Sequence, residues 1–177
     1  MSRGGKSARN AWRPQASVIF ASPVHLLAFG FGTGLVPKGP GTAGTLVGIP
    51  LFLAMMHLSL PLFAMLTIAL SVFGCWLCGE SARRLGVHDY GGIVFDEIVG
   101  YVIAASPLLP TFALNRHGLV PGLIAAFVLF RIFDIWKPWP ISWLDARLQG
   151  GIGIMVDDLV AGLFAAVALW WGLILLG

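Results

Sequence analysis

The sequence is organised around five long apolar stretches, separated by short polar or glycine-rich connections. A helix needs about 20 mostly apolar residues to cross the hydrocarbon core of a bilayer. All five stretches approach this length, although the first is short and contains Pro50. We therefore predict an all-α fold, a small polytopic membrane bundle with about four to five transmembrane helices. The stretches cover 42–57, 61–80, 93–109, 119–136 and 152–176.

The composition supports a membrane protein. Of the 177 residues, 58% are hydrophobic and 11% are charged, whereas a soluble domain has about 25% charged residues. This excludes a disordered chain and a basic nucleic-acid-binding domain, and it argues against an ordinary soluble domain. The length indicates one domain. We expect a membrane-embedded domain over 17–177, preceded by a flexible basic tail over 1–16 that contains Arg3, Lys6, Arg9 and Arg13.

The positions of the cations predict the orientation. If all five stretches cross, one face receives the N-terminal tail and the loops 81–92 and 137–151, and ten of the eleven Lys and Arg residues lie on that face. Loops rich in Lys and Arg stay in the cytoplasm. We therefore place the N-terminus and this face in the cytoplasm. A re-entrant first hairpin is the alternative, and it would leave the later crossings unchanged.

Four unusual patches fall on this face, and the first is the glycine- and threonine-rich stretch GTGLVPKGPGTAGT over 32–45. Glycine lets a backbone approach a ligand closely, and amides and hydroxyls at a helix start suit a phosphate. The alternative is a turn-rich entry into the first helix, since this is not a Walker loop. The candidate phosphate-binding groups are Thr33, Thr42 and Thr45, with the amides of Gly41 and Gly44.

The other three patches carry most of the acidic residues. Two adjacent acidic pairs each enter an apolar stretch, where ionisable groups are costly and by default functional. Charge at a helix N-terminus explains one carboxylate of such a pair better than two. Between the pairs, three charged residues recur every three positions and share one helix face. The alternative to a functional role is an Arg–Asp pair that snorkels at the end of a membrane span. These residues are Asp96 and Glu97, Asp157 and Asp158, and Arg131, Asp134 and Lys137.

Five of the eight acidic residues therefore gather near one end of three different stretches. Clustered carboxylates repel one another unless a cation sits among them. Oxygen ligands without a His or Cys set suit Mg²⁺. Mg²⁺ between carboxylates, beside basic residues and a Gly/Thr loop, is typical of a phosphate-handling site. The residues alone therefore indicate Mg²⁺-dependent chemistry on a phosphorylated lipid headgroup at the cytoplasmic face.

The sequence resembles the phosphatidylglycerophosphatase A family at these same residues. The matching stretches are GFGTGLVPKGPGTAGTL, GVHDYGGIVFDEIVG and FRIFDIWKPWPISWLDARLQGGIGIMVDDLVAG, in the family's order over 29–162. The resemblance implies an all-helical, Mg²⁺-dependent enzyme of bacterial inner membranes. Such an enzyme hydrolyses the terminal phosphate monoester of phosphatidylglycerophosphate, yielding phosphatidylglycerol and inorganic phosphate in glycerophospholipid biosynthesis.

Our hypothesis is metal-assisted hydrolysis in which the acidic residues bind the metal and carry the catalysis. Asp134 either completes the metal site or acts as base for the attacking water. Arg131 and Lys137 neutralise phosphate charge, and His88 and Asp89 are candidates for acid–base help. The metal ligands or their supporting groups are Asp96, Glu97, Asp157 and Asp158, and the expected catalytic residues are Asp96, Asp134 and Asp158.

Four alternative interpretations have less support in the sequence. Cys75 and Cys78 form a C-x-x-C without two further ligands or a redox context, so we expect them to be inert. Cys78 and Arg84 have the C-x5-R spacing of cysteine phosphatases, but Glu80 lies inside the spacing and the stretch reads as a helix end. A cation pathway would need acidic residues beyond one face. A headgroup transferase would need a D-x-x-D-G-x-x-A-R motif, which the sequence lacks.

Overall fold

The computed structural model describes residues 14–87, 90–110 and 118–176, and these residues form helices and loops without a β-strand. The predicted all-α class is therefore confirmed. In chain order the helices are α1 (Ala16–Ala21), α2 (Pro23–Ala28), the 3-10 helix η1 (Gly30–Leu35), α3 (Pro40–Met55), α4 (Leu60–Leu85), α5 (Phe95–Ala104), the 3-10 helix η2 (Ser106–Leu108), α6 (Leu119–Trp136), α7 (Ile141–Arg147) and α8 (Gly150–Leu176).

Three of the described helices, α4, α6 and α8, are long and apolar enough to cross a membrane. The first predicted crossing forms α3, which has 16 residues, and the third forms α5, which has ten, followed by η2. The shortness of α5 has a physical reason. Eight of its ten residues are buried, and an apolar run of this length is more typical of a buried core helix than of a crossing.

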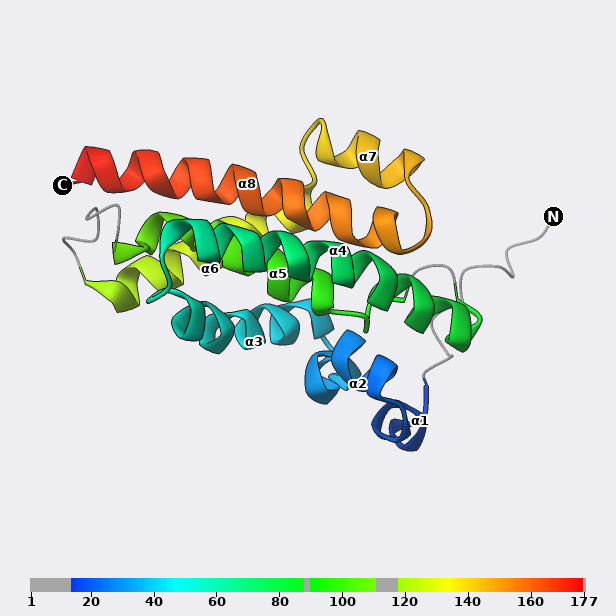
Figure 1. Cartoon of the computed structure of the whole chain (residues 1–177). Helices are drawn as coiled ribbons and strands as arrows, with labels where there is room; N and C mark the ends of the chain where they lie inside the picture. The colour runs from blue at the N-terminus through cyan, green and yellow to red at the C-terminus, as the bar shows by residue number, and fades with distance from the viewer. Residues whose placement is uncertain (1–13, 88–89, 111–117, 177) are drawn as a thin grey trace.

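The helices form a bundle with α5 inside it, in contact with α3, α4, α6 and α8 (Figure 1). The chain reverses direction between successive long helices. At one end of the bundle lie α7, the end of α4 and the starts of α3, α5 and α8 (Figure 1). We call this the α7 end. The opposite end holds the end of α8 and the starts of α4 and α6 (Figure 1).

Two glycines allow α5 and α8 to pack closely. A methyl group added at Gly162 of α8 would lie 2.5 Å from the carbonyl oxygen of Gly100 in α5. A methyl group at Gly100 would in turn lie 2.9 Å from the carbonyl oxygen of Asp158. These separations are too short for any side chain larger than hydrogen, so the two backbones are in direct contact. The contact lies one helical turn from Asp96 and from Asp158.

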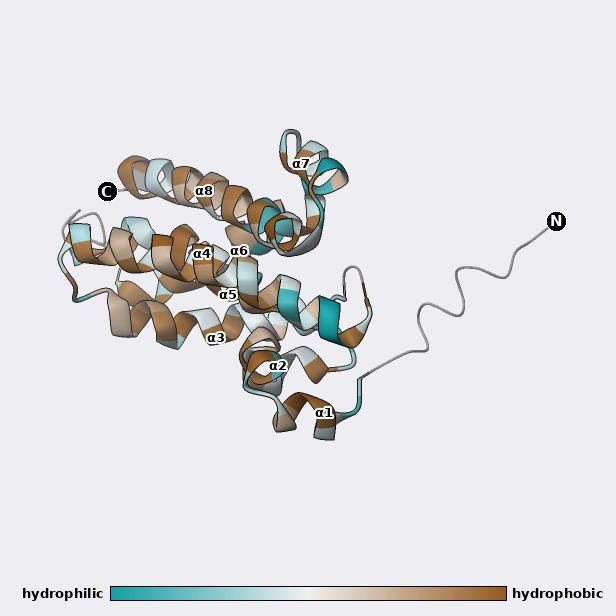
Figure 2. Cartoon of the chain, turned by 45° about the vertical axis from the view of Figure 1, so that its right-hand side comes forward, coloured by the Kyte–Doolittle hydropathy of each residue, from teal (hydrophilic) through white to brown (hydrophobic). Residues whose placement is uncertain are grey.

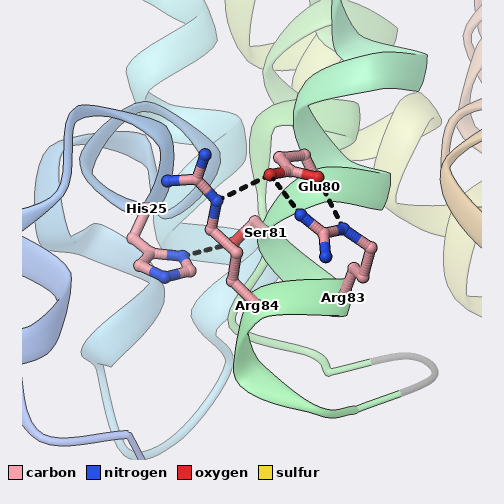
Figure 3. A network of polar contacts seen from close by, with 5 residues as sticks. All are labelled: His25, Glu80, Ser81, Arg83 and Arg84. Carbon is pink, nitrogen blue, oxygen red and sulfur yellow. Dashed lines mark hydrogen bonds and ion pairs between the residues drawn. The ribbon is translucent and has the colours of Figure 1, made fainter.

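The N-terminal helices brace the start of α5. The ring of His25 in α2 is buried and its Nδ1 lies 2.9 Å from Oγ of Ser81 in α4 (Figure 3). Burial and the nearby charge of Arg84 lower the pKa of His25, so the neutral ring is favoured. At the start of α5, the amide of Val94 donates a 2.8 Å hydrogen bond to the carbonyl oxygen of Ala28. The residue that caps α5 is therefore tied to α2.

The surface of the bundle is apolar where a membrane would surround it. Figure 2 shows hydrophobic colouring along most of α4, α6 and α8, and hydrophilic colouring at the end of α4 and around α7 and the start of α8. Large apolar side chains point outward from all three long helices. They include Met65, Ile68 and Val72 of α4, Val120, Ile124 and Val128 of α6, and Leu163, Val167 and Trp171 of α8. This arrangement is that of a membrane protein.

Candidate active site

The structure brings three of the predicted acidic residues into one cluster at the α7 end. Asp96 and Glu97 lie in the first turn of α5, where carboxylates complement the helix dipole. Asp158 lies in α8, and the close packing of α5 and α8 brings it to them. One carboxylate oxygen from each of the three lies within 4.8 Å of the other two. Their spacing is that of ligands around one small cation.

The cluster lies in a cavity of about 250 Å³. Six of the chain's eight acidic residues line this cavity. Of the other two, Glu80 lies at the end of α4, and Asp89 lies outside the described residues. We call this space the acidic cavity. Its lining residues are Gly91, Ile93, Asp96, Glu97, Asp134, Lys137, Asp145, Leu148, Gln149, Gly150, Gly153, Ile154, Asp157 and Asp158.

Several buried carboxylate oxygens in the acidic cavity have no hydrogen-bond partner among the described residues. They are Asp96 Oδ1, Glu97 Oε2 and Asp157 Oδ1. A buried polar oxygen without a partner is costly, and a buried carboxylate more so. Hard oxygen donors suit Mg²⁺. These residues therefore fit a divalent cation, with Asp96, Glu97 and Asp158 closest to one another.

Among the described residues, Lys137 is the basic side chain that lines this cavity, and it forms ion pairs with two carboxylates. Its Nζ lies 2.5 Å from Asp157 Oδ2 and 3.0 Å from Asp145 Oδ1. Burial lowers the pKa of Lys137, but the hydrogen bonds to Asp157 and Asp145 outweigh burial, and the pKa lies above its ordinary value. The charged ammonium is therefore favoured. An ammonium has three donors, and these contacts occupy two of them.

The backbone of Lys137 is in the left-handed region, with φ 43° and ψ 58°, at the C-cap of α6. Its amide donates a 2.9 Å hydrogen bond to the carbonyl oxygen of Phe133, which closes the helix. Glycine and asparagine are the usual residues in this conformation, and a lysine there is strained. Strain of this kind at a cavity points to a functional side chain.

Arg131 lies behind the carboxylates and does not line the acidic cavity. Its Nη1 is 2.5 Å from Asp134 Oδ2 and 3.9 Å from Glu97 Oε1. The same nitrogen donates a 3.4 Å hydrogen bond to the hydroxyl of Thr45. The guanidinium of Arg131, which α6 carries and which also contacts Thr45 of α3, thus neutralises and orients the carboxylates of Asp134 and Glu97.

The predicted Gly/Thr loop divides into two parts. Gly41 and Thr45 lie in α3 beside the cluster, and a side chain at Gly41 would collide with Glu97 Oε1 and approach Arg131 Nη1 to 3.1 Å. Gly41 is therefore required for α3 to pack against α5. None of the predicted phosphate-binding groups of this loop lines the acidic cavity, neither Gly41, Gly44 and Thr45 in α3 nor Thr33 and Thr42. The hydroxyl of Thr33 donates a 2.9 Å hydrogen bond to Gly30 within η1, and Thr42 is exposed.

Comparisons with known proteins identify the family of this chain. The family model for phosphatidylglycerophosphatase A matches residues 26–172. The chain belongs to the phosphatidylglycerophosphatase A family. A protein named phosphatidylglycerophosphatase A from Escherichia coli K12 is 45% identical to it over 85% of this chain and 84% of that protein. A protein of the same name from Haemophilus influenzae is 40% identical over 89% of this chain and 93% of that protein. A Bacteroides thetaiotaomicron protein, named as a proposed phosphatidylinositol-3-phosphatase, is 39% identical over 82% of this chain and 92% of its own length. No solved structure matches.

Membership of the phosphatidylglycerophosphatase A family makes the chain a phosphatase, so the cysteine alternative can be examined on the structure. Cys78 has no exposed surface and lies inside α4, which continues as regular helix through Arg84. A cysteine phosphatase needs a loop between these residues, with backbone amides pointing inward. The helix leaves no such loop. Cys75 and Cys78 are both free thiols, consistent with the inert role predicted for them.

Asp145 and Gln149 also line the acidic cavity, from α7 and the connection to α8, and neither stood out in the sequence. Both lie between the long apolar stretches, where a polar residue is ordinary, so only the fold brings them to the site. The candidates His88 and Asp89 and the basic tail residues Arg3, Lys6, Arg9 and Arg13 lie outside the described residues.

Proposed function

We propose that this chain is a Mg²⁺-dependent phosphatase that hydrolyses the terminal phosphate monoester of phosphatidylglycerophosphate to phosphatidylglycerol and inorganic phosphate. One observation carries the proposal. In a member of the phosphatidylglycerophosphatase A family, Asp96, Glu97 and Asp158 converge within 4.8 Å beside unpartnered oxygens and a lysine in one cavity. Bound Mg²⁺ would polarise the phosphate and lower the pKa of a water molecule.

The chain's own residues have distinct parts in this proposal. Asp96, Glu97 and Asp158 hold the metal, and Asp157 supports it while anchoring Lys137. The third donor of Lys137 binds a phosphate oxygen of the substrate. Asp134, oriented by Arg131, accepts the proton of the attacking water. The water oxygen attacks phosphorus, the bond from phosphorus to the glycerol oxygen breaks, and that oxygen takes up a proton from solvent, to which Asp134 later releases the proton that it accepted.

The proposal places the site at the cytoplasmic face of a bacterial inner membrane. The α7 end carries the acidic cavity and six cations of the described residues. They are Lys38, Arg83, Arg84, Arg131, Lys137 and Arg147. A face rich in Lys and Arg is retained in the cytoplasm. The lipid tails would then remain in the inner leaflet beside the long helices, with the headgroup at the level of the cavity.

The named activities of the relatives share a substrate chemistry. A phosphatidylglycerophosphate headgroup and a phosphatidylinositol-3-phosphate headgroup both carry a phosphate monoester on a polyol, which a phosphodiester joins to the lipid. In both, a free hydroxyl lies on the carbon next to the phosphorylated carbon. We therefore assign the substrate class as phosphorylated polyol phospholipids, and phosphatidylglycerophosphate as its member for this chain.

The experiment measures phosphate release from phosphatidylglycerophosphate in detergent by the purified protein, with Mg²⁺ or with excess EDTA. Wild type should release phosphate only with Mg²⁺. Asp158→Asn should lose at least about a hundredfold in rate, as expected when a charged group essential to the reaction is removed. Glu80→Gln removes the same charge outside the cavity and should keep the wild-type rate.

Two results would contradict the proposal. Release that persists in EDTA would exclude the metal, and Cys78→Ser would then test whether the cysteine carries the reaction. No release from folded wild type under either condition would exclude this substrate.

A further inference from the structure

The acidic cavity, with a volume of about 250 Å³, extends beyond the metal cluster to α7. The metal cluster lies on α5 and α8, where three carboxylate oxygens fall within 4.8 Å of one another. Another part of the lining, Asp145, Leu148 and Gln149, comes from α7 and its connection to α8. Apart from the contact of Asp145 with Lys137, this part of the cavity has no role in the proposed hydrolysis.

The α7 part of the cavity has a different chemistry from the metal cluster. Gln149 contributes a neutral amide, which offers two donors and an acceptor. Asp145 contributes a carboxylate of which one oxygen contacts Lys137, so it retains lone pairs that can accept. A phosphate dianion is poorly matched by a carboxylate and a neutral amide. A hydroxyl group is well matched, because it donates to a carboxylate and accepts from an amide.

Lys137 connects the metal cluster with the α7 part of the cavity. Its Nζ contacts Asp157, which neighbours the metal cluster, and Asp145 on α7. A phosphate bound by the remaining donor of Lys137 therefore lies next to both parts of the cavity. A hydroxyl on the carbon adjacent to the phosphorylated carbon lies only a few bonds from that phosphate. It would fall on the α7 side.

We propose that Gln149 and Asp145 form a subsite for the free hydroxyl of the headgroup polyol, next to the phosphate monoester. The inference rests on the proposed function and goes beyond it, since it names what the enzyme recognises besides phosphate. Gln149 determines specificity by bonding this hydroxyl. Asp145 accepts from the same hydroxyl and also positions Lys137, so its replacement affects every substrate.

The test compares two lipids that differ by one oxygen atom. One is phosphatidylglycerophosphate, and the other is its deoxy analogue, in which 1,3-propanediol replaces the glycerol that links the two phosphates. Both have the same length and charge. For wild type, kcat/KM should be at least about tenfold lower on the deoxy analogue, because the analogue lacks the hydroxyl that bonds both Gln149 and Asp145.

Gln149→Ala completes the comparison. It should lower kcat/KM about tenfold on phosphatidylglycerophosphate, since one hydrogen bond to the hydroxyl is lost. It should leave the rate on the deoxy analogue at the wild-type value, because the analogue has no hydroxyl for Gln149 to bind. Gln15→Ala is the matched control, since Gln15 is exposed at the start of α1 and does not line the cavity. It should change neither rate. Asp145→Asn should lower both rates.

Three other outcomes would overturn the proposed subsite, and they differ in what they say about the proposed function. Equal rates of wild type on the two lipids would overturn the subsite while leaving the proposed function intact. An equal loss on both lipids in Gln149→Ala would show a structural role for Gln149 and would also overturn it. Absence of phosphate release by wild type from either lipid would refute the proposed function, and the subsite with it.

Discussion

Lys137 illustrates how a single residue combines backbone strain with a functional charge. Its left-handed backbone, at φ 43°, disfavours every residue with a Cβ atom. We predict that Lys137→Gly unfolds with a free energy about 1 kcal/mol higher than Lys137→Ala, because glycine alone relieves the strain. Both variants should lose phosphate release, because both lack the ammonium. Chemical unfolding in detergent and the phosphate-release assay measure the two effects.

The comparison of the two variants removes a confounding effect. Both leave Asp157 buried without its partner, so this cost cancels between them. Equal stability of the glycine and alanine variants would show that the left-handed backbone at this position carries no strain. Full activity of either would show that the ammonium does not bind the substrate.

At the residue scale, the sequence predicted the acidic cluster better than its surroundings. Asp96, Glu97 and Asp158 stood out because carboxylates in apolar helices are costly without a purpose. Asp145 carried no such signal, since an acidic residue in a short helix outside the long apolar stretches is ordinary. Thr33 and Thr42 were predicted from a glycine-rich pattern, but the local turn of η1 and the exposed start of α3 direct them away from the cavity.

At the scale of elements, the contact between α5 and α8 assembles the site. Asp158 and Gly162 lie four residues apart and so share one face of α8. We predict that Gly162→Ala lowers the free energy of unfolding by about 1–3 kcal/mol, because the new methyl group would lie 2.5 Å from the carbonyl oxygen of Gly100. Phosphate release should fall as well, since Asp158 is displaced from the carboxylates of α5. Thermal unfolding in detergent and the release assay are the measurements.

Gly172→Ala in α8 is the control for this prediction. A methyl group there meets no atom within 4 Å, and alanine favours a helix over glycine by roughly 1 kcal/mol. This variant should be as stable as wild type or slightly more so, with unchanged activity. Tolerance of alanine at Gly162 would contradict the close packing of the two helices.

The helices themselves were predictable from hydrophobicity, but whether lipid or protein surrounds each of them was not. The stretches 61–80, 119–136 and 152–176 form α4, α6 and α8, which expose apolar side chains along their length. The stretch 93–109 is equally apolar, yet it forms the short, buried α5. Composition alone cannot separate these cases, because lipid and a protein core are similarly apolar solvents for a side chain. The packing partners of α5 decide between them.

On the scale of the whole molecule, the bundle gathers charge at one end. The acidic cavity, α7 and the described cations Arg83, Arg84 and Arg147 lie at the α7 end, while the turn between α3 and α4 lies at the other. The positive charge predicts that the α7 end faces the cytoplasm. We therefore expect Ala146→Cys, in α7, to be shielded from a membrane-impermeant maleimide in intact spheroplasts, and Ser59→Cys, in the turn, to be labelled.

Two features of the chain make this labelling experiment decisive. Ala146 and Ser59 are both exposed, so a difference between them reports the side of the membrane rather than burial. Cys78 is buried and Cys75 partly so, and the wild-type protein measures whatever background they give. After permeabilisation both variants should be labelled. Labelling of Ala146→Cys from outside would place the cavity at the outer face. The phosphatase would then act on lipid in the outer leaflet, and the positive charge of the α7 end would need another cause.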